Sequence, residues 1–226
     1  MKTIDVVQGS EEWHRCRAGR VTASKVADLL AKTKTGWGAS RANYAAQLVA
    51  ERLTGRIDRN GYMNVAMQWG TDTEPEAREI YSLLGGVSVD PAGFVLHPAI
   101  EMSGCSPDGI VTSETGNGLV EIKCPMTAGH IETLLGGEVP GKYVKQMQWQ
   151  MACCELPWCD FVSYDPRMPA EMQLFVRRVD RDDKLIAEME KQVVEFLDEV
   201  DQTVASLVSR YSIKASSDKV LLSVEE

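Results

Sequence analysis

Two acids and a lysine in the middle of the chain have the types and spacing that metal-dependent hydrolysis of a phosphodiester requires. Asp108 lies in the segment Cys-Ser-Pro-Asp-Gly, and Glu121 and Lys123 lie in the following segment Glu-Ile-Lys-Cys-Pro. Side chains alternate along a strand, so Glu121 and Lys123 are expected on one face. Two carboxylates can hold a hard divalent cation beside an ammonium group. Such a cation polarises the phosphoryl oxygen and activates water, which indicates a nuclease core.

The elements that must position these residues are predicted from hydrophobic periodicity. Short strands are expected over residues 87–89, 93–97, 102–106, 110–112, 119–124, 158–164 and 172–179, and a loop over residues 33–40. Helices are expected over residues 41–53, 65–84, 127–135 and 141–154, preceded by two short helices near the amino terminus. Pro75 lies inside the span 65–84, so either that helix kinks or a new one starts there. This order predicts an α/β fold, with a mixed central sheet flanked by helices.

A long amphipathic helix is predicted near the carboxyl terminus, because apolar residues from Ile186 to Leu207 recur at steps of three and four. With 226 residues, 44% of them hydrophobic, the chain is expected to form a single domain over 1–226. We divide it into a basic helical part facing DNA (1–59), a catalytic core (60–180) and the amphipathic helix with its tail (181–226).

The location of the protein is predicted from segments that the sequence lacks. No apolar run approaches the length of a membrane span, and Met1 to Gly9 do not resemble a signal peptide. A cytoplasmic protein without a membrane partner is therefore expected. The six cysteines form no Cys-x-x-Cys pair, so we expect reduced, mostly buried thiols rather than a zinc site.

The charge is unevenly distributed along the chain. The net charge is −9, yet residues 1–59 contain eleven Lys or Arg against six acids. This quarter is the candidate phosphate-facing surface, although an ordinary solvated basic face would give the same counts. The candidate side chains are Arg15, Arg17, Arg20, Lys25, Lys32, Lys34 and Arg41.

Seven motifs in order along residues 13–168 resemble the phage lambda exonuclease family, the YqaJ-type viral recombinase nucleases of the PD-(D/E)xK, restriction-endonuclease-like group. The first two are Trp13-His14-x-x-Arg17-x-Gly19-x-Val21-Thr22-Ala23-Ser24 and Trp69-Gly70-x-x-x-Glu74-x-x-Ala77-Arg78. The two acid-bearing segments follow, and then Leu135-Gly136-Gly137, Tyr143-x-x-Gln146-x-Gln148 and Tyr164-Asp165-Pro166-Arg167-Met168. The resemblance implies a restriction-endonuclease-like core.

The resemblance also implies roles for the acids. Asp108, Glu121 and the backbone carbonyl of Ile122 would ligate Mg²⁺, with Mn²⁺ as a substitute. Lys123 would orient or activate the attacking water, and Glu74 would position water or a second ion. A surface ion-pair cluster is the alternative for Asp108, Glu121 and Lys123, and a solvated helix glutamate is the alternative for Glu74. The three histidines, His14, His97 and His130, are interpreted as structural, because a metal-dependent mechanism does not require them.

A second set of residues resembles the family's pocket for a terminal 5′ phosphate: Arg17, Ser24, Ser106 and Gln146. A guanidinium fork with hydroxyl and amide donors suits a phosphate group. Met67 falls where the family has an apolar side chain that splits the terminal base pair, and core packing is the alternative. The loop from Lys32 to Ser40 is shorter than in the lambda enzyme, and Ser40 replaces an expected apolar wedge.

The resemblance therefore implies a Mg²⁺-dependent, processive 5′-to-3′ exonuclease of double-stranded DNA. It would release 5′ mononucleotides and leave 3′ overhangs for recombination by single-strand annealing. Its implied partners are duplex DNA ends, two further copies in a homotrimeric ring and a single-strand annealing protein, in a bacterial cytosol and encoded by a phage or prophage. A restriction-type endonuclease and a DNA-end-binding module that does not cut are the alternatives.

Overall fold

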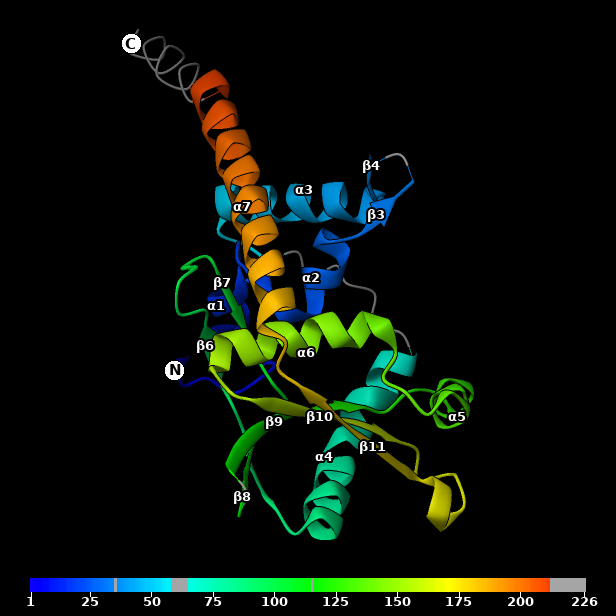
Figure 1. The fold of residues 1–226 in the computed structure, drawn as a ribbon. Helices are drawn as coiled ribbons and strands as arrows, with labels where there is room; N and C mark the ends of the chain where they lie inside the picture. The colour runs from blue at the N-terminus through cyan, green and yellow to red at the C-terminus, as the bar shows by residue number, and fades with distance from the viewer. Residues whose placement is uncertain (35, 58–64, 115, 212–226) are drawn as a thin grey trace, which may run out of the picture.

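The computed structural model describes residues 1–34, 36–57, 65–114 and 116–211. Its main sheet contains β5 (Ser88–Asp90), β8 (Gly109–Ser113), β9 (Gly116–Lys123), β10 (Trp158–Tyr164) and β11 (Leu174–Asp180) in the order β11-β10-β9-β8-β5. Only β9 and β10 are parallel; the other neighbours are antiparallel. Helix α4 (Val65–Gly85) covers one face and α6 (Gly141–Cys154) the other (Figure 1). The predicted α/β class with a mixed, helix-flanked sheet is confirmed.

A second sheet joins the amino terminus to the segment that precedes Asp108. Its strand order is β1-β6-β7-β2, formed by β1 (Lys2–Ile4), β6 (Phe94–Leu96), β7 (Ser103–Cys105) and β2 (Val21–Thr22). β2 runs parallel to β7, with Val21 opposite Ser103 and Thr22 opposite Gly104. β1 and β2 were not predicted, because two or three residues are too few for an alternation to be recognised.

Two short helices flank β2 in the sequence. α1 (Glu11–Arg17) begins at Ser10, whose hydroxyl accepts a hydrogen bond from the Trp13 amide at 3.1 Å. The turn after α1 places Gly19 at φ 68°, a left-handed conformation that favours glycine. α2 (Ala23–Leu29) follows directly and buries Val26 and Leu29.

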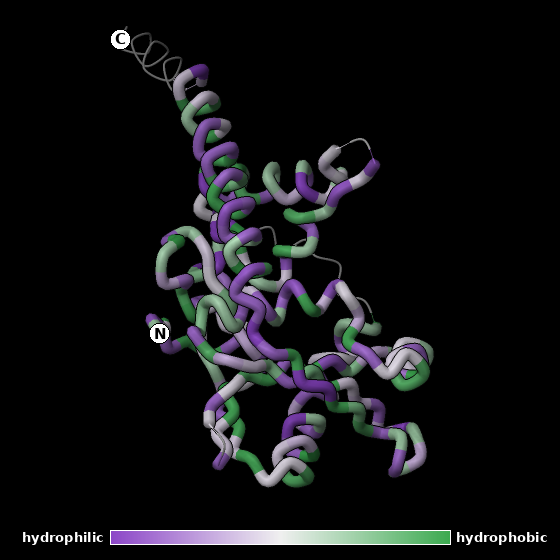
Figure 2. The backbone as a smooth tube through the Cα atoms, in the orientation of Figure 1, coloured by the Kyte–Doolittle hydropathy of each residue, from purple (hydrophilic) through white to green (hydrophobic). Residues whose placement is uncertain are grey.

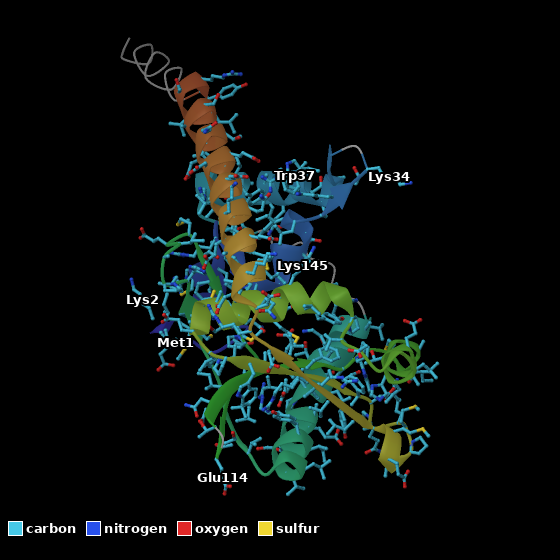
Figure 3. All side chains as sticks on the ribbon, in the orientation of Figure 1. Met1, Lys2, Lys34, Trp37, Glu114 and Lys145 are labelled. Atoms are coloured by element: carbon cyan, nitrogen blue, oxygen red, sulfur yellow. The ribbon has the colours of Figure 1, made fainter. Side chains whose placement is uncertain are left out.

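The predicted loop over residues 33–40 is partly wrong. Lys32–Thr33 (β3) and Gly36–Trp37 (β4) form a small antiparallel hairpin before α3 (Ala39–Thr54). The Thr33 hydroxyl donates to the carbonyl of Gly36 at 3.2 Å and stabilises this pairing locally. The hairpin stands away from the body of the molecule, with Lys34 and Trp37 on it (Figures 1 and 3).

The predicted carboxyl-terminal amphipathic helix is confirmed as α7 (Asp183–Tyr211). It buries Met189, Val193 and Phe196 and packs across α3, while purple and green alternate along its length (Figures 1 and 2). The predicted tail lies outside the described residues from 212 onward, as does the proposed boundary between residues 59 and 60. The three-part division of the chain stays a prediction.

The remaining predicted helices are present with small shifts at their ends. α4 continues through Pro75, so this residue does not start a new helix. α5 (Thr127–Gly136) lies beside the sheet and ends at Gly137 in a left-handed conformation, and a short 3₁₀ turn (Ala170–Met172) precedes β11. Five of the six cysteines are buried, as predicted, and Cys16 is half-buried. Within the described residues, no helix combines the length and apolar character needed to cross a bilayer.

Candidate active site

The register of β8 and β9 positions Asp108 beside the Glu-Ile-Lys segment. Asp108 directly precedes β8, and the first residue of that strand, Gly109, lies opposite Val120 of β9. The backbone amide of Ile122 donates to Oδ2 of Asp108 at 2.6 Å. The structure therefore brings together Asp108, Glu121 and Lys123 at the end of β9, although they are separate in the sequence.

Glu121 is fully buried and both of its carboxylate oxygens are held by neighbouring side chains. Lys123 Nζ forms an ion pair with Oε1, and Gln146 Nε2 donates to the same oxygen at 2.5 Å. Gln150 Nε2, one turn further along α6, donates to Oε2 at 2.5 Å. The structure thus places Gln146, expected in the phosphate pocket, on the carboxylate of Glu121. Gln150 was not identified from the sequence, although its spacing of four from Gln146 puts both on one helix face.

Glu74 approaches this centre from α4. Its Oε1 accepts a hydrogen bond from Arg78 Nη2 at 2.6 Å, one helical turn away. Glu74 and Lys123 line one cavity of ≈ 480 Å³, which we call the carboxylate cavity. The other lining residues are Ala66, Met67, Gly70, Thr71, Ile122, Cys124, Pro125 and Tyr143.

The electrostatics of the site favour a bound cation. Burial raises the pKa of Asp108 well above its ordinary value, and the nearby carboxylates of Glu121 and Glu74 raise it further. Burial also raises the pKa of Glu74, against the opposing effect of Arg78 and Lys123. For Lys123, burial lowers the pKa, but Glu121 and Asp108 outweigh burial and the pKa is raised. One ammonium group therefore faces more negative charge than it can balance.

The available ligands are hard oxygen atoms, which suit Mg²⁺. In the described part of the chain, no group of three or more His, Cys, Asp or Glu is arranged to hold a metal ion. Mg²⁺ needs only one or two carboxylates, because it retains several waters. Asp108, Glu121 and a backbone carbonyl of β9 therefore fit such an ion.

A second cavity, of ≈ 380 Å³, contains the expected phosphate-binding side chains Arg17 and Ser24. Arg17 Nη2 donates to Ser24 Oγ at 3.4 Å, and burial lowers the pKa of Arg17 from its ordinary value. An arginine remains protonated in proteins, so this guanidinium is a partly desolvated cation. We call this space the basic cavity; Arg20, Thr22, Lys25, Tyr44, Gln47, Leu48, Glu51, Ile57, Trp13, His14 and Met67 complete its lining.

Trp13 connects two of the expected phosphate-binding residues. The guanidinium carbon of Arg17 lies 4.1 Å from the centroid of the Trp13 ring. The indole Nε1 donates to Ser106 Oγ at 2.8 Å. Arg17, Ser24 and Ser106 are therefore linked through contacts with Trp13 or with each other, while Gln146 contacts Glu121 instead. The sequence gives no signal for these contacts, because a tryptophan within a helical pattern usually indicates core packing.

Met67 lines both the basic cavity and the carboxylate cavity. Its side chain is 57% exposed, so the alternative of core packing is wrong. The two cavities therefore adjoin at one apolar side chain on α4.

The histidines His97 and His130 are buried and hydrogen-bonded inside the fold. His97 Nδ1 accepts from the amides of Ala99 and Ile100, and the imidazole of His130 bonds Ser163 Oγ and the carbonyl of Met172. These contacts agree with the structural role predicted for both residues.

Comparison with known families identifies the chain. The YqaJ-like viral recombinase domain matches residues 12–157, which include all of the candidate residues described above. The chain belongs to the YqaJ-like viral recombinase family. No curated protein matches it.

This YqaJ-like protein is also similar to solved structures. An alkaline exonuclease (LHK-Exo) from Laribacter hongkongensis is 48% identical, with a TM-score of 0.82 over 91% of this chain and 100% of the other. The same enzyme in complex with dAMP gives a TM-score of 0.83 at 48% identity, over 90% of this chain and 98% of the other. A phage-related exonuclease from Haemophilus somnus 129PT shares the fold at 16% identity, with a TM-score of 0.65 over 83% and 96% of the two chains. The family and the 48% identical relative together support a nuclease of the recombinase type.

Proposed function

We propose that the protein is a Mg²⁺-dependent, processive exonuclease that degrades the 5′-ended strand of duplex DNA. It releases 5′ mononucleotides and leaves 3′ overhangs for recombination by single-strand annealing. The observation that supports this proposal best is the shared wall at Met67, because the basic cavity adjoins the carboxylate cavity there. A terminal phosphate held by Arg17 and Ser24 would bring the first phosphodiester of that strand to the acids. Such an arrangement selects an end without reading any base.

The residues in and around the carboxylate cavity have distinct roles in the proposed reaction. Asp108, Glu121 and the carbonyl of Ile122 would hold Mg²⁺, which when bound would polarise the phosphoryl group and lower the pKa of water. Lys123 stays protonated, because its pKa is raised by Glu121 and Asp108, so it donates hydrogen bonds rather than accepting a proton. Its charge stabilises the negative charge that develops on the phosphoryl oxygens. Glu74 orients the attacking water from α4.

Digestion of a blunt linear duplex, labelled at either the 5′ or the 3′ end, tests this function. We expect Mg²⁺-dependent release of mononucleotides from 5′-phosphorylated ends, support by Mn²⁺, and no activity with a chelator. Internal fragments would identify a restriction-type endonuclease, and retention of uncut DNA would identify an end-binding module. Asp108→Asn is the matched inactive control.

A homotrimeric ring is proposed as the source of processivity, because a site of this size releases its strand after each cut unless the protein encloses the DNA. Light scattering of the purified protein is expected to give three times the 25.0 kDa chain mass. A monomer that still degrades long duplexes without dissociating would contradict the ring. The proposed second partner, a single-strand annealing protein, is tested by co-purification with the annealing protein of the same phage or prophage. We also propose that the protein acts in a bacterial cytosol, because it belongs to a family of viral recombinases.

A further inference from the structure

Gln150 is a buried polar residue that the proposed chemistry does not use. It lies on α6, is fully buried, and donates from Nε2 to Oε2 of Glu121 at 2.5 Å. On the other side of its amide, Oε1 faces Cys159 Sγ at 4.0 Å. Only one orientation of the amide is favourable, because the opposite one would direct its oxygen at a carboxylate.

The two oxygens of Glu121 have different partners. Oε1 receives both Lys123 and Gln146, whereas Gln150 is the side chain that donates to Oε2. A carboxylate held at one oxygen can still turn about its terminal torsion, which has a broad energy profile. Donors on both oxygens fix the plane of the group. Gln150 therefore restricts Glu121 in a way that Lys123 and Gln146 do not.

We infer that Gln150 is a positioning residue of the nuclease centre, which fixes the Glu121 carboxylate in the orientation that binds the divalent cation. This inference depends on the proposed function. The groups that hydrogen-bond a metal-ligating carboxylate typically change cation affinity or activity by about 10- to 100-fold when they are removed. Gln150 does not line the basic cavity, so binding of the DNA end does not depend on it.

The same helix contains a matched control. Gln148 is also buried, but its amide donates to the carbonyl of Asp180 and accepts from the amide of Asp182. Replacing it removes a buried glutamine and two hydrogen bonds without touching Glu121. Gln148→Met and Gln150→Met therefore separate loss of a buried amide from loss of the Glu121 contact.

Mn²⁺ binding to the full chain without DNA, measured by calorimetry, is the first readout, and kcat and KM on phosphorylated duplex ends are the second. For Gln150→Met we expect Mn²⁺ affinity and kcat to fall by about 10- to 100-fold with an unchanged KM. For Gln148→Met we expect both to stay near the wild-type values even where the melting temperature falls. Wild-type affinity and kcat in Gln150→Met would overturn the inference.

Two further outcomes are distinguishable. If Gln150→Met does not fold, Gln150→Asn keeps a buried amide but shortens the side chain by one methylene, so that its donor is withdrawn from Oε2. Its Mn²⁺ affinity and kcat should also fall, and unchanged values would again overturn the inference. A wild-type protein that neither binds Mn²⁺ nor cuts DNA would refute the proposed function itself.

Discussion

Lys123 Nζ forms an ion pair with Oε1 of Glu121, a carboxylate that has no exposed surface. The two residues lie two positions apart on β9, so their side chains project from the same face of the strand. The lysine is half-buried and lines the carboxylate cavity, whereas the glutamate lies beneath it. This pair therefore connects the buried end of the site to its open end.

Lys123→Ala is expected to reduce hydrolysis sharply while DNA binding is retained, because the variant removes the ammonium group to which the proposed mechanism assigns stabilisation of the developing charge. A loss of about 10²- to 10³-fold in kcat is typical when one such stabilising group is removed. Single-turnover cleavage and end-binding titrations measure the two properties separately. Lys142→Ala is the control, because Lys142 and Lys123 both lie over the Tyr143 ring, with Nζ at 4.7 Å and 5.5 Å from its centroid, and only Lys123 pairs with Glu121 among the described contacts. Wild-type turnover in Lys123→Ala would remove Lys123 from the mechanism.

Arg17→Ala is expected to reduce the preference for 5′-phosphorylated over 5′-hydroxyl ends by about 10-fold, the effect of losing a charge-assisted hydrogen bond. Competition between the two duplexes in one digestion measures this preference. Arg15→Ala is the matched control on the same helix, because Arg15 is exposed and pairs with Glu12 at 2.7 Å. If the wild type and Arg17→Ala showed the same preference for 5′-phosphorylated ends, the basic cavity would not be the site that binds the terminal phosphate.

Met67→Ala is expected to shorten the run of nucleotides removed per binding event while changing the free energy of unfolding by no more than about 0.5 kcal/mol. The side chain is largely exposed, so its removal leaves no buried cavity. Digestion in the presence of a DNA trap measures processivity. Val65→Ala, at an 80% exposed position on the same helix, should leave processivity unchanged. Equal run lengths in the two variants would argue against strand separation by Met67.

Asp165 is expected to make stability depend on pH in the acid range. Burial raises the pKa of Asp165, but hydrogen bonds from Arg167 and Thr127 outweigh burial and lower it to about 2 from 3.8. A lowered folded-state pKa means that the contribution to stability is full above 3.8 and is lost as the pH falls through 2. The Asp165 carboxylate, which follows β10, accepts a hydrogen bond from Thr127 of α5 and another from Arg167. The Arg167 guanidinium also lies 4.0 Å from the centroid of the Trp69 ring on α4.

The test compares the wild type with Asp165→Asn by thermal unfolding at several pH values. We expect the variant to be less stable by about 2 kcal/mol at pH 7, the scale for a buried hydrogen-bonded charge. This difference should shrink as the pH falls from 4 towards 2. If the stability difference between the two proteins stayed constant over that range, the ionised form of Asp165 would not contribute to stability.

The sequence predicts the placement of the candidate catalytic acids better than that of the groups that surround them. The shared face of Glu121 and Lys123 follows from strand alternation, and Asp108 is identified by its segment Cys-Ser-Pro-Asp-Gly, since both signals are local. The contacts of Gln146 and Gln150 depend instead on the rotation of α6 against β9. Residues 147–154 are all buried, so hydrophobic periodicity does not distinguish the faces of that helix. The contact of the Trp13 indole N–H with Ser106 has no local signal in the sequence either, because the two residues are 93 positions apart.

The parallel pairing of β2 with β7 has a consequence for the length of the product. Ser24 follows β2 by two residues, and Ser106 and Asp108 follow β7. The two adjacent strands therefore lead to the candidate phosphate-binding side chain and to the candidate catalytic acid. Under the proposed function, the register of Thr22 against Gly104 fixes the distance between the bound 5′ end and the point of cleavage, and so the number of nucleotides removed in each cut. Insertion of one residue between β7 and Asp108 would change that distance without changing the side chains at either position.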